Sequence, residues 1–321
     1  MLSLRLVMTT MYKVEKISKP LTLGEGPHWD VETQCLYYVD IKSGSIHCYN
    51  RELNKNYSAV VGEGKKPVSL IIPVEGQSNR YMISVKNDVA LVTWDGASTD
   101  VTDLEVIASL EPADNTNRLN DGKADPKGRL WAGTMGRQII DEVTQEKTYE
   151  LEKGSLYLLY KDKTVKKQLT KLGIANGLAW TVDKKKMYYI DSMKKRVDSY
   201  DYDDDTGNLS NEKVVFDFTK NEIPGFPDGM TMDAEGKLYV ANYGGSQVLK
   251  IDPESGDLLD KIVIPALNVT SVAFGGTNLD ELYVTTASAD KPTVEGEEND
   301  GCLFRVTSIN AKGLPAHNII I

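Results

Sequence analysis

A short β-rich pattern that recurs six times constrains this chain more than any other feature of its sequence. Each copy has an alternating apolar strand, a tight turn and a second alternating strand, in which β-branched and aromatic residues dominate. The intervals between copies run from 44 to 57 residues, measured between Leu36, Tyr81, Leu130, Met187, Leu238 and Leu282. Intervals of this length are typical of the blades of a β-propeller.

The turns between these strands favour the same fold. Residues 42–45, 203–207 and 252–256 carry the Gly, Asp and Pro that hairpin turns require. We therefore predict an all-β fold, a six-bladed β-propeller of four-stranded antiparallel blades, as a single domain over residues 12–321. A strand within residues 12–17 is expected to pair with the last blade and close the ring. Residues 1–11 are expected to form a poorly ordered N-terminal extension.

The third interval is the longest, and its excess falls in residues 137–153. We predict an excursion there, before the next strand of that blade.

Composition excludes several classes of partner. The 321 residues include 47 acidic and 37 basic side chains, a net charge of -10, which argues against nucleic acid or an anionic membrane as partner. No stretch approaches the roughly 20 apolar residues that a membrane-spanning helix needs. The three cysteines give no disulfide framework, and residues 1–11 lack a small-residue cleavage pattern. We expect a cytoplasmic protein that acts on a small molecule as a monomer or weak dimer.

A second pattern precedes four of the strands by 10 or 11 residues. It reads GEGPHW from Gly24, RLNDG from Arg118, ANGLAW from Ala175 and PDGM from Pro227. In a propeller the innermost strand of each blade begins at such a position, so the first polar side chains should point to one axial spot. Those side chains are Glu25, Asn120, Asn176 and Asp228. Glycines follow closely in each motif and allow the strands to converge.

Two carboxylates and two amide oxygens form an all-oxygen set that suits a hard divalent cation. Ca²⁺, Mg²⁺ and Mn²⁺ prefer such ligands, whereas three histidines in the whole chain make a multi-histidine zinc site a poor interpretation. Asx-Gly before a strand is also ordinary turn chemistry. Four copies in register with the repeat favour the cation site, because carboxylates buried at one point without a cation are costly.

A second acidic run has the spacing of an EF-hand loop without its other features. Asp201, Asp203, Asp205 and Glu212 occupy the expected positions, but Thr206 stands where the loop needs glycine and strands flank the run. We interpret it as a solvated hairpin turn.

At these motifs the sequence resembles the SMP-30/gluconolactonase/regucalcin family. GEGPHW, NRLNDGKADPKGRLWAGTM, IANGLAW and PGFPDGMTMD carry the resemblance, which extends over the chain from about Tyr12. The variant GEGPHWD, with SVAFGGTNLDELYVT near the end, looks most like the insect branch of the family, which includes insect regucalcins and luciferin-regenerating enzymes.

The resemblance implies a six-bladed propeller with one catalytic divalent cation, Ca²⁺ first, with Mg²⁺, Mn²⁺ or Zn²⁺ as alternatives. Glu25, Asn176 and Asp228 fall on the family's metal ligands, and Asp228 also on its general base. Arg118 and Asn120 fall on its substrate-contacting positions.

One position departs from the family pattern. After the GTM at residues 133–135, the lactonases of the family carry an acidic residue that contacts substrate hydroxyls, whereas this chain has Arg137 and Gln138. We expect Gln138 to contact the substrate there.

The function expected from these observations is hydrolysis of a small lactone such as gluconolactone. The cation would polarise the carbonyl while Asp228 takes a proton from the attacking water, and Arg118 would fix a substrate oxygen. Two alternatives stay open. One is a calcium-binding regulatory protein without significant turnover, and the other is an activity like that of luciferin-regenerating enzymes on an aromatic heterocycle.

Overall fold

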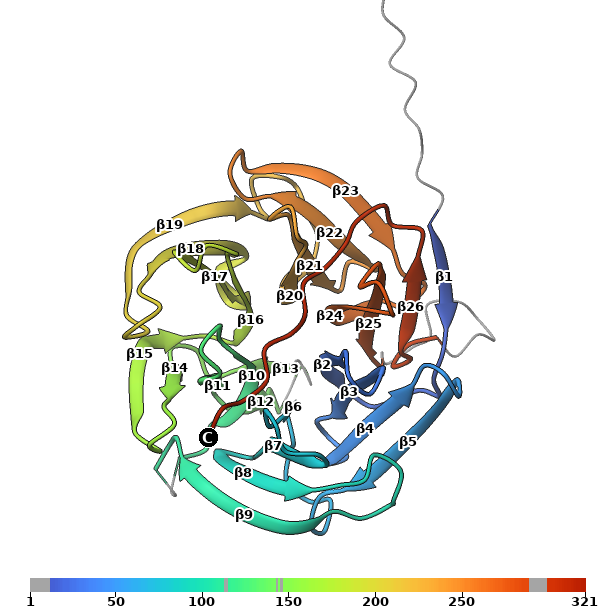
Figure 1. The fold of residues 1–321 in the computed structure, drawn as a ribbon. Helices are drawn as coiled ribbons and strands as arrows, with labels where there is room; N and C mark the ends of the chain where they lie inside the picture. Colours follow the sequence, from blue (N-terminus) through green and yellow to red (C-terminus); the bar gives the residue numbers. More distant parts are fainter. Residues whose placement is uncertain (1–11, 113–114, 143, 145–146, 289–298) are drawn as a thin grey trace, which may run out of the picture.

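A computed structural model describes residues 12–112, 115–142, 144, 147–288 and 299–321. The sheets of these residues stand around a common axis, as Figure 1 shows in the view along it. One 3-10 helix, η1 (Ser192–Lys194), occurs among them. No helix in this part of the chain is long and apolar enough to cross a membrane. The predicted extension over residues 1–11 lies outside the described residues.

Four sheets have four antiparallel strands each, in chain order from the axis outward. The first contains β2 (Gly24–Asp30), β3 (Cys35–Asp40), β4 (Ser45–Asn50) and β5 (Lys55–Val60). The second contains β6 (Ile71–Pro73), β7 (Arg80–Val85), β8 (Asp88–Thr93) and β9 (Thr102–Ser109). The third contains β10 (Arg118–Ala124), β11 (Leu130–Met135), β14 (Gly154–Leu159) and β15 (Val165–Leu172). The fourth contains β16 (Ala175–Trp180), β17 (Lys186–Asp191), β18 (Arg196–Tyr202) and β19 (Leu209–Asp217).

The remaining large sheet has eight strands in two halves. One half contains β20 (Phe226–Met232), β21 (Leu238–Tyr243), β22 (Gln247–Asp252) and β23 (Asp257–Val263). The other contains β24 (Asn268–Gly275), β25 (Glu281–Ala287), β26 (Phe304–Thr307) and β1 (Lys13–Lys16). A single pairing of Tyr243 with Asn268 joins the halves. The predicted all-β propeller is therefore confirmed, while hydrogen bonding separates the described strands into four four-stranded sheets, this double one and a separate two-stranded hairpin.

The ring closes as predicted, through the first strand. β1 pairs antiparallel with β26, with Lys13 opposite Thr307 and Lys16 opposite Phe304. Trp29 in the first sheet also stacks on Tyr283 in the last, with ring centroids 5.1 Å apart. The two ends of the ring are thus held by main-chain pairing and by aromatic packing.

The core lies between neighbouring sheets. Every residue of β3, β11 and β16 is buried, because these strands have another sheet on each side. The outer strand β9 is exposed over most of its length. Each blade therefore buries its inner strands and leaves its outer edge in water.

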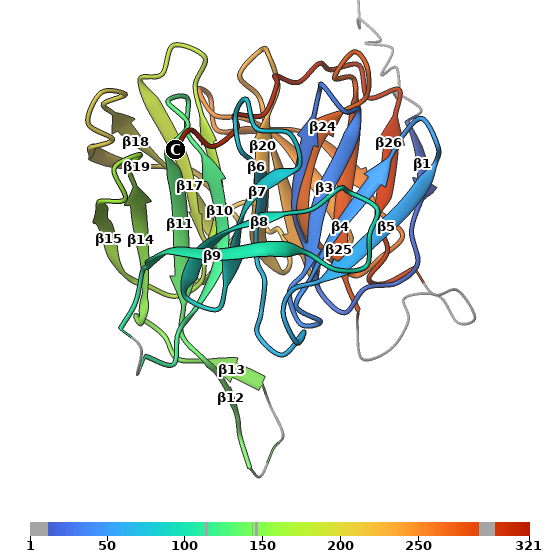
Figure 2. The ribbon, with the colours of Figure 1, turned by 60° about the horizontal axis from the view of Figure 1, so that its bottom comes forward.

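The two faces of the ring carry different structures. The predicted excursion forms the hairpin of β12 (Gln138–Ile140) and β13 (Lys147–Tyr149), which projects from one face in Figure 2. The C-terminal chain crosses the opposite face, over the axis in Figure 1. It is held there by backbone hydrogen bonds such as Ile319 N to Pro73 O (2.9 Å) and Gly313 N to Leu279 O (2.7 Å).

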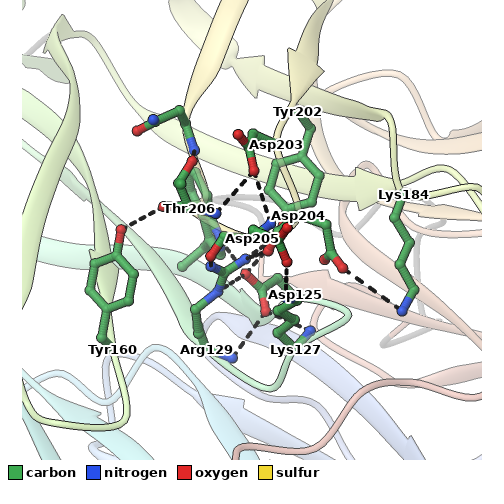
Figure 3. Close-up of polar contacts among 12 residues, drawn as sticks. Asp125, Lys127, Arg129, Tyr160, Lys184, Tyr202, Asp203, Asp204, Asp205 and Thr206 are labelled. Carbon is green, nitrogen blue, oxygen red and sulfur yellow. Dashed lines mark hydrogen bonds and ion pairs between the residues drawn. The ribbon is translucent and has the colours of Figure 1, made fainter.

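A buried ionic network joins the third and fourth sheets (Figure 3). The carboxylate of Asp125 accepts hydrogen bonds from Arg129 Nε (2.7 Å) and from the Tyr202 hydroxyl (2.9 Å). Arg129 also donates to the carbonyls of Asp204 (2.8 Å) and Asp205 (3.1 Å) in the β18–β19 turn. Both carboxylate oxygens of Asp125 and all three guanidinium nitrogens of Arg129 are hydrogen-bonded, as a buried ion pair requires.

The acidic run in the β18–β19 turn does not converge on one point. The Asp203 carboxylate accepts from two backbone N–H groups of its own turn, Asp205 pairs with Lys127, and Glu212 pairs with Arg196 (2.8 Å). The interpretation as a hairpin turn is confirmed.

Removing the Tyr202 hydroxyl should weaken this link between sheets. Tyr202→Phe takes one donor from Asp125 and one acceptor from Arg129 while the ring stays in place. We expect the free energy of unfolding to fall by about 1 kcal/mol, a typical value for a lost hydrogen bond. Chemical denaturation measures it, with Tyr57→Phe as the matched control, because within the described residues the hydroxyl of the partly buried Tyr57 makes no hydrogen bond. Equal midpoints for the two variants would contradict the role given to the network.

Candidate metal and substrate site

Bulges at the start of the innermost strands aim the polar side chains at the axis. The register between β10 and β11 shifts between Leu119 and Gly122, so Asn120 and Asp121 lie opposite a single partner residue. The same shift occurs between β16 and β17 at Asn176, and between β20 and β21 at Asp228. In β2 the shift follows Glu25 directly. A β-bulge re-aims a side chain and frees it from the ladder, and bulges are frequent beside active sites.

Glycines beside these side chains let the strands converge, as the sequence predicts. A Cβ on Gly229 would lie 2.0 Å from Ser271 Oγ in the neighbouring strand β24. A Cβ on Gly177 would lie 2.7 Å from Met230 Cβ in β20. No larger residue fits at either position without a shift of backbone.

Asn120 does not join the predicted oxygen set. Its Oδ1 accepts a hydrogen bond from Arg118 Nη1 (2.8 Å), and its Nδ2 donates to the carbonyl of Ala175 (2.9 Å). Four converging oxygen side chains were expected from the sequence, but this amide is occupied in holding Arg118. This correction leaves Glu25, Asn176 and Asp228 as the oxygen donors.

Asn176 and Asp228 each present a buried oxygen without a partner. Asn176 Nδ2 donates to Ser192 Oγ (2.8 Å), and that hydroxyl donates to the carbonyl of Pro227 (2.7 Å). The amide is thereby oriented with its oxygen free. Within the described residues, Asn176 Oδ1 and Asp228 Oδ1 are buried atoms with no hydrogen-bond partner. Such atoms are rare in folded proteins and point to a missing ligand.

Carboxyl groups are concentrated at this end of the axis. Burial first, and then the nearby charge of Asp121, raises the pKa of Glu25 to about 8. The pKa of Asp228 lies well above its usual range, first because of burial and then because of Glu25 and Asp121. Among the described residues, Arg118, whose own pKa is lowered by burial, is the cation that acts on both Glu25 and Asp228. Three buried carboxyl groups, those of Glu25, Asp121 and Asp228, thus share the single guanidinium of Arg118. A further positive charge beside them would stabilise their ionised forms.

Sequence reasoning missed Asp121. Strand alternation assigns it to the face opposite Asn120, and only the bulge brings it beside the carboxylates. Its pKa is raised by burial, against the lowering effect of Lys123. The available signal was the acidic residue directly after Asn120 in the RLNDG motif.

The residues present fit a hard divalent cation. The donors are carboxylate and amide oxygens, and two of those oxygens have no other use. In the described part of the chain, no three His, Cys, Asp or Glu side chains form a metal cluster by themselves. The fit therefore depends on the amide oxygen of Asn176 acting together with Glu25 and Asp228.

Gln138 lies on the projecting hairpin and not in the buried set. It stands opposite Tyr149, its Nε2 lies 3.4 Å from the Tyr149 hydroxyl, and its side chain is exposed. Tyr149 in turn acts electrostatically on Arg118. Glu150 fixes the base of the hairpin by bonding Arg137 Nε (3.1 Å).

Comparison with known proteins finds related chains over nearly the whole length. A profile described as the SMP-30/Gluconolactonase/LRE-like region matches residues 23–288. Regucalcin from Xenopus laevis is 36% identical over 300 residues, which cover 93% of this chain and 95% of that protein. Regucalcin from Homo sapiens is 36% identical over 297 residues, with 92% and 94% covered.

Solved structures give the same picture. A luciferin-regenerating enzyme superposes with a TM-score of 0.88 at 46% identity and covers 97% of this chain and 100% of its own. A regucalcin from Agrobacterium tumefaciens, described as a calcium-binding protein, superposes with a TM-score of 0.82 at 24% identity, covering 96% and 98%. The second similarity shows the shared fold.

Proposed function

The chain belongs to the SMP-30/gluconolactonase/LRE-like family, and from that membership we propose that it is a divalent-metal-dependent hydrolase of a small lactone. The observation that carries the proposal is the pair of partnerless buried oxygens on Asn176 and Asp228. They lie among carboxyl groups whose pKa values are raised. The guanidinium of Arg118 lies beside them, and only its Nη1 donates hydrogen bonds within the described residues. Charge of both signs at one buried point is typical of a catalytic centre.

Glu25, Asn176 and Asp228 would hold the cation. When bound, it supplies Lewis-acid stabilisation of the charge that develops on the lactone carbonyl oxygen. Ca²⁺ is the proposed ion, because the ligands are all oxygen and a relative of the same fold is described as calcium-binding. Mg²⁺, Mn²⁺ and Zn²⁺ are the alternatives that the experiment below compares.

Asp228 is proposed as the general base. One of its oxygens is without a hydrogen bond, so it can accept a proton from a water molecule that attacks the carbonyl carbon. Water adds to that carbon, the ring C–O bond breaks, the alkoxide takes the proton, and a hydroxy acid leaves.

Arg118 would bind a substrate oxygen. In the described residues only its Nη1 donates hydrogen bonds, to Leu119 O (2.9 Å) and Asn120 Oδ1, which leaves Nε and Nη2 for the ligand. Asn120 then acts by orienting Arg118, and Gln138 would contact the outer part of the substrate.

A proton-release assay on D-glucono-1,5-lactone tests the proposal. Metal-stripped protein should be inactive and should regain turnover with one of Ca²⁺, Mg²⁺, Mn²⁺ or Zn²⁺. Clear cation binding without turnover on any lactone would instead favour a calcium-binding regulatory protein, the role suggested by the name of the regucalcin relatives.

The luciferin-regenerating enzyme supports a second candidate, an activity on an aromatic heterocycle. It is 46% identical to this chain, and the exposed Ile140, on the same face of the hairpin as Gln138, makes that face less polar than a sugar requires. The same identity supports the insect branch proposed from the sequence.

Gln138→Glu separates the two candidates. A carboxylate accepts charge-assisted hydrogen bonds from substrate hydroxyls, so kcat/KM for gluconolactone should rise about fivefold while that for a lactone without hydroxyls stays level. Steady-state kinetics on both lactones measures it. Thr148→Glu is the control, since it adds the same charge opposite Ile139 on the other face of the hairpin. An equal change with both variants would show that only hairpin charge matters.

We further propose six blades, counting the halves of the double sheet separately, and a cytoplasmic protein that acts as a monomer or weak dimer. The net charge of -10 supports a small-molecule partner and no nucleic acid or membrane.

A further inference from the structure

The C-terminal chain forms a roof over the end of the axis opposite the metal site. Its backbone is pinned on one side at Gly313 and on the other at Ile319. Between these points, residues 314–317 make no backbone hydrogen bond within the described structure. Beside this stretch, Asn318 Oδ1 lies 3.1 Å from His28 Nε2 of β2, and Asn318 Nδ2 donates to Glu75 Oε2 (2.9 Å).

A cavity of about 110 Å³ lies under this roof. Its walls come from the far ends of five innermost strands, β2, β10, β16, β20 and β24, and residues 314–317 line it on the roof side, so that it stays partly open to solvent. Trp180 and Phe274 supply large aromatic surface, and Thr231 supplies a hydroxyl. A cavity of about 150 Å³ accepts a benzene-sized molecule, so this one suits a ligand of three to five carbon atoms.

The titratable side chains that line the cavity are all basic. Within the described residues they are Lys123, His28 and His317, with no carboxylate among them. Lys123 Nζ donates to the carbonyls of Leu178 (3.1 Å) and Met230, which leaves one of its three N–H groups. Asp121, toward the metal site, is the acid in the described chain whose charge acts on Lys123.

Burial favours the neutral form of two of these basic groups. It lowers the pKa of Lys123 and brings the pKa of His28 to about 4. A buried basic group of this kind gains most from an anion beside it.

We propose that this cavity is a second ligand site, separate from the metal site, which binds a short-chain monocarboxylate. The carboxylate accepts a hydrogen bond from Lys123, and the apolar body packs between Trp180 and Phe274. The proposal does not rest on the hydrolase activity.

Butyrate and its neutral isostere butanamide test the site in the full-length protein. Isothermal titration should detect butyrate with a Kd on the order of 1 mM, and butanamide should bind at least about tenfold more weakly. Tryptophan fluorescence should change with butyrate, since Trp180 lines the cavity.

Three variants complete the experiment. Lys123→Met should weaken butyrate binding about tenfold or more. Ala316→Trp, on the exposed roof, should abolish it by filling the cavity without disturbing the strands. Asp228→Asn should leave it unchanged, which excludes the metal site as the place of binding. Equal affinity for butanamide, binding that survives Ala316→Trp, or no binding at about 20 mM butyrate would each overturn the proposal.

Discussion

Asp228→Asn should lower kcat/KM for the lactone by about 10³-fold, because general bases contribute factors of this size. The amide keeps the shape of the carboxylate but accepts no proton from water and carries no charge for the cation. Its neighbours Gly229 and Pro227 are unchanged, so the bulge that aims it should persist. The measurement is the proton-release assay with saturating Ca²⁺, beside calorimetric titration of the cation.

Asp257, an exposed residue at the start of the outer strand β23, provides the control. Asp257→Asn makes the same chemical change away from the axis and should leave both activity and cation binding as they are. If kcat/KM of Asp228→Asn lies within about threefold of that of the native protein, the assignment of Asp228 as general base is wrong. If Asp228→Asn loses activity but binds the cation with unchanged affinity, Asp228 is the general base and is not a ligand of the cation.

Metal-free protein should lose stability as the pH rises from 6.5 to 8. Glu25 has a folded pKa of about 8 against an ordinary value of 4.5, so between these values the folded state binds more protons than the unfolded state. Stability then falls with rising pH, by about 1.4 kcal/mol per unit for one such group. Over 1.5 units this gives about 2 kcal/mol, to which the raised pKa values of Asp121 and Asp228 add.

The window starts at pH 6.5 because buried histidines oppose the effect below it. His28 and His47 have pKa values near 4, lowered by burial, and they make the protein more stable as the pH rises toward 6.5. Thermal unfolding in EDTA at pH 6.5, 7.0, 7.5 and 8.0 gives the slope. Ca²⁺ should raise the Tm most at pH 8, where the carboxylates are ready to bind it. Glu25→Gln should flatten the slope, and a Tm in EDTA that rises over this range would contradict the assignment.

The repeat made the fold predictable from sequence. Six strand-turn-strand copies at blade spacing predict the propeller, and the strand within residues 12–17 predicts how it closes. Close-packed positions such as Gly177 and Gly229 were likewise visible, because glycine before an apolar strand is a local signal.

The roles of individual residues in the site were harder to predict from the sequence. Period-two alternation does not reveal a bulge, so Asp121 was not included among the predicted axial side chains. The hydrogen bond from Arg118 to Asn120 joins two residues on the same strand, and no spacing rule reveals which amide keeps a free oxygen. The roof at residues 314–317 has neither strand periodicity nor turn chemistry, so no sequence pattern indicated that it covers a cavity.

The pairing of β1 with β26 also sets the order of events during synthesis. Lys13 leaves the ribosome 294 residues before its partner Thr307. At about 5 to 20 residues per second, β1 waits about 15 to 60 s for β26. The ring therefore closes only when translation is almost finished, and until then the growing chain carries an unpaired sheet edge that a chaperone can bind.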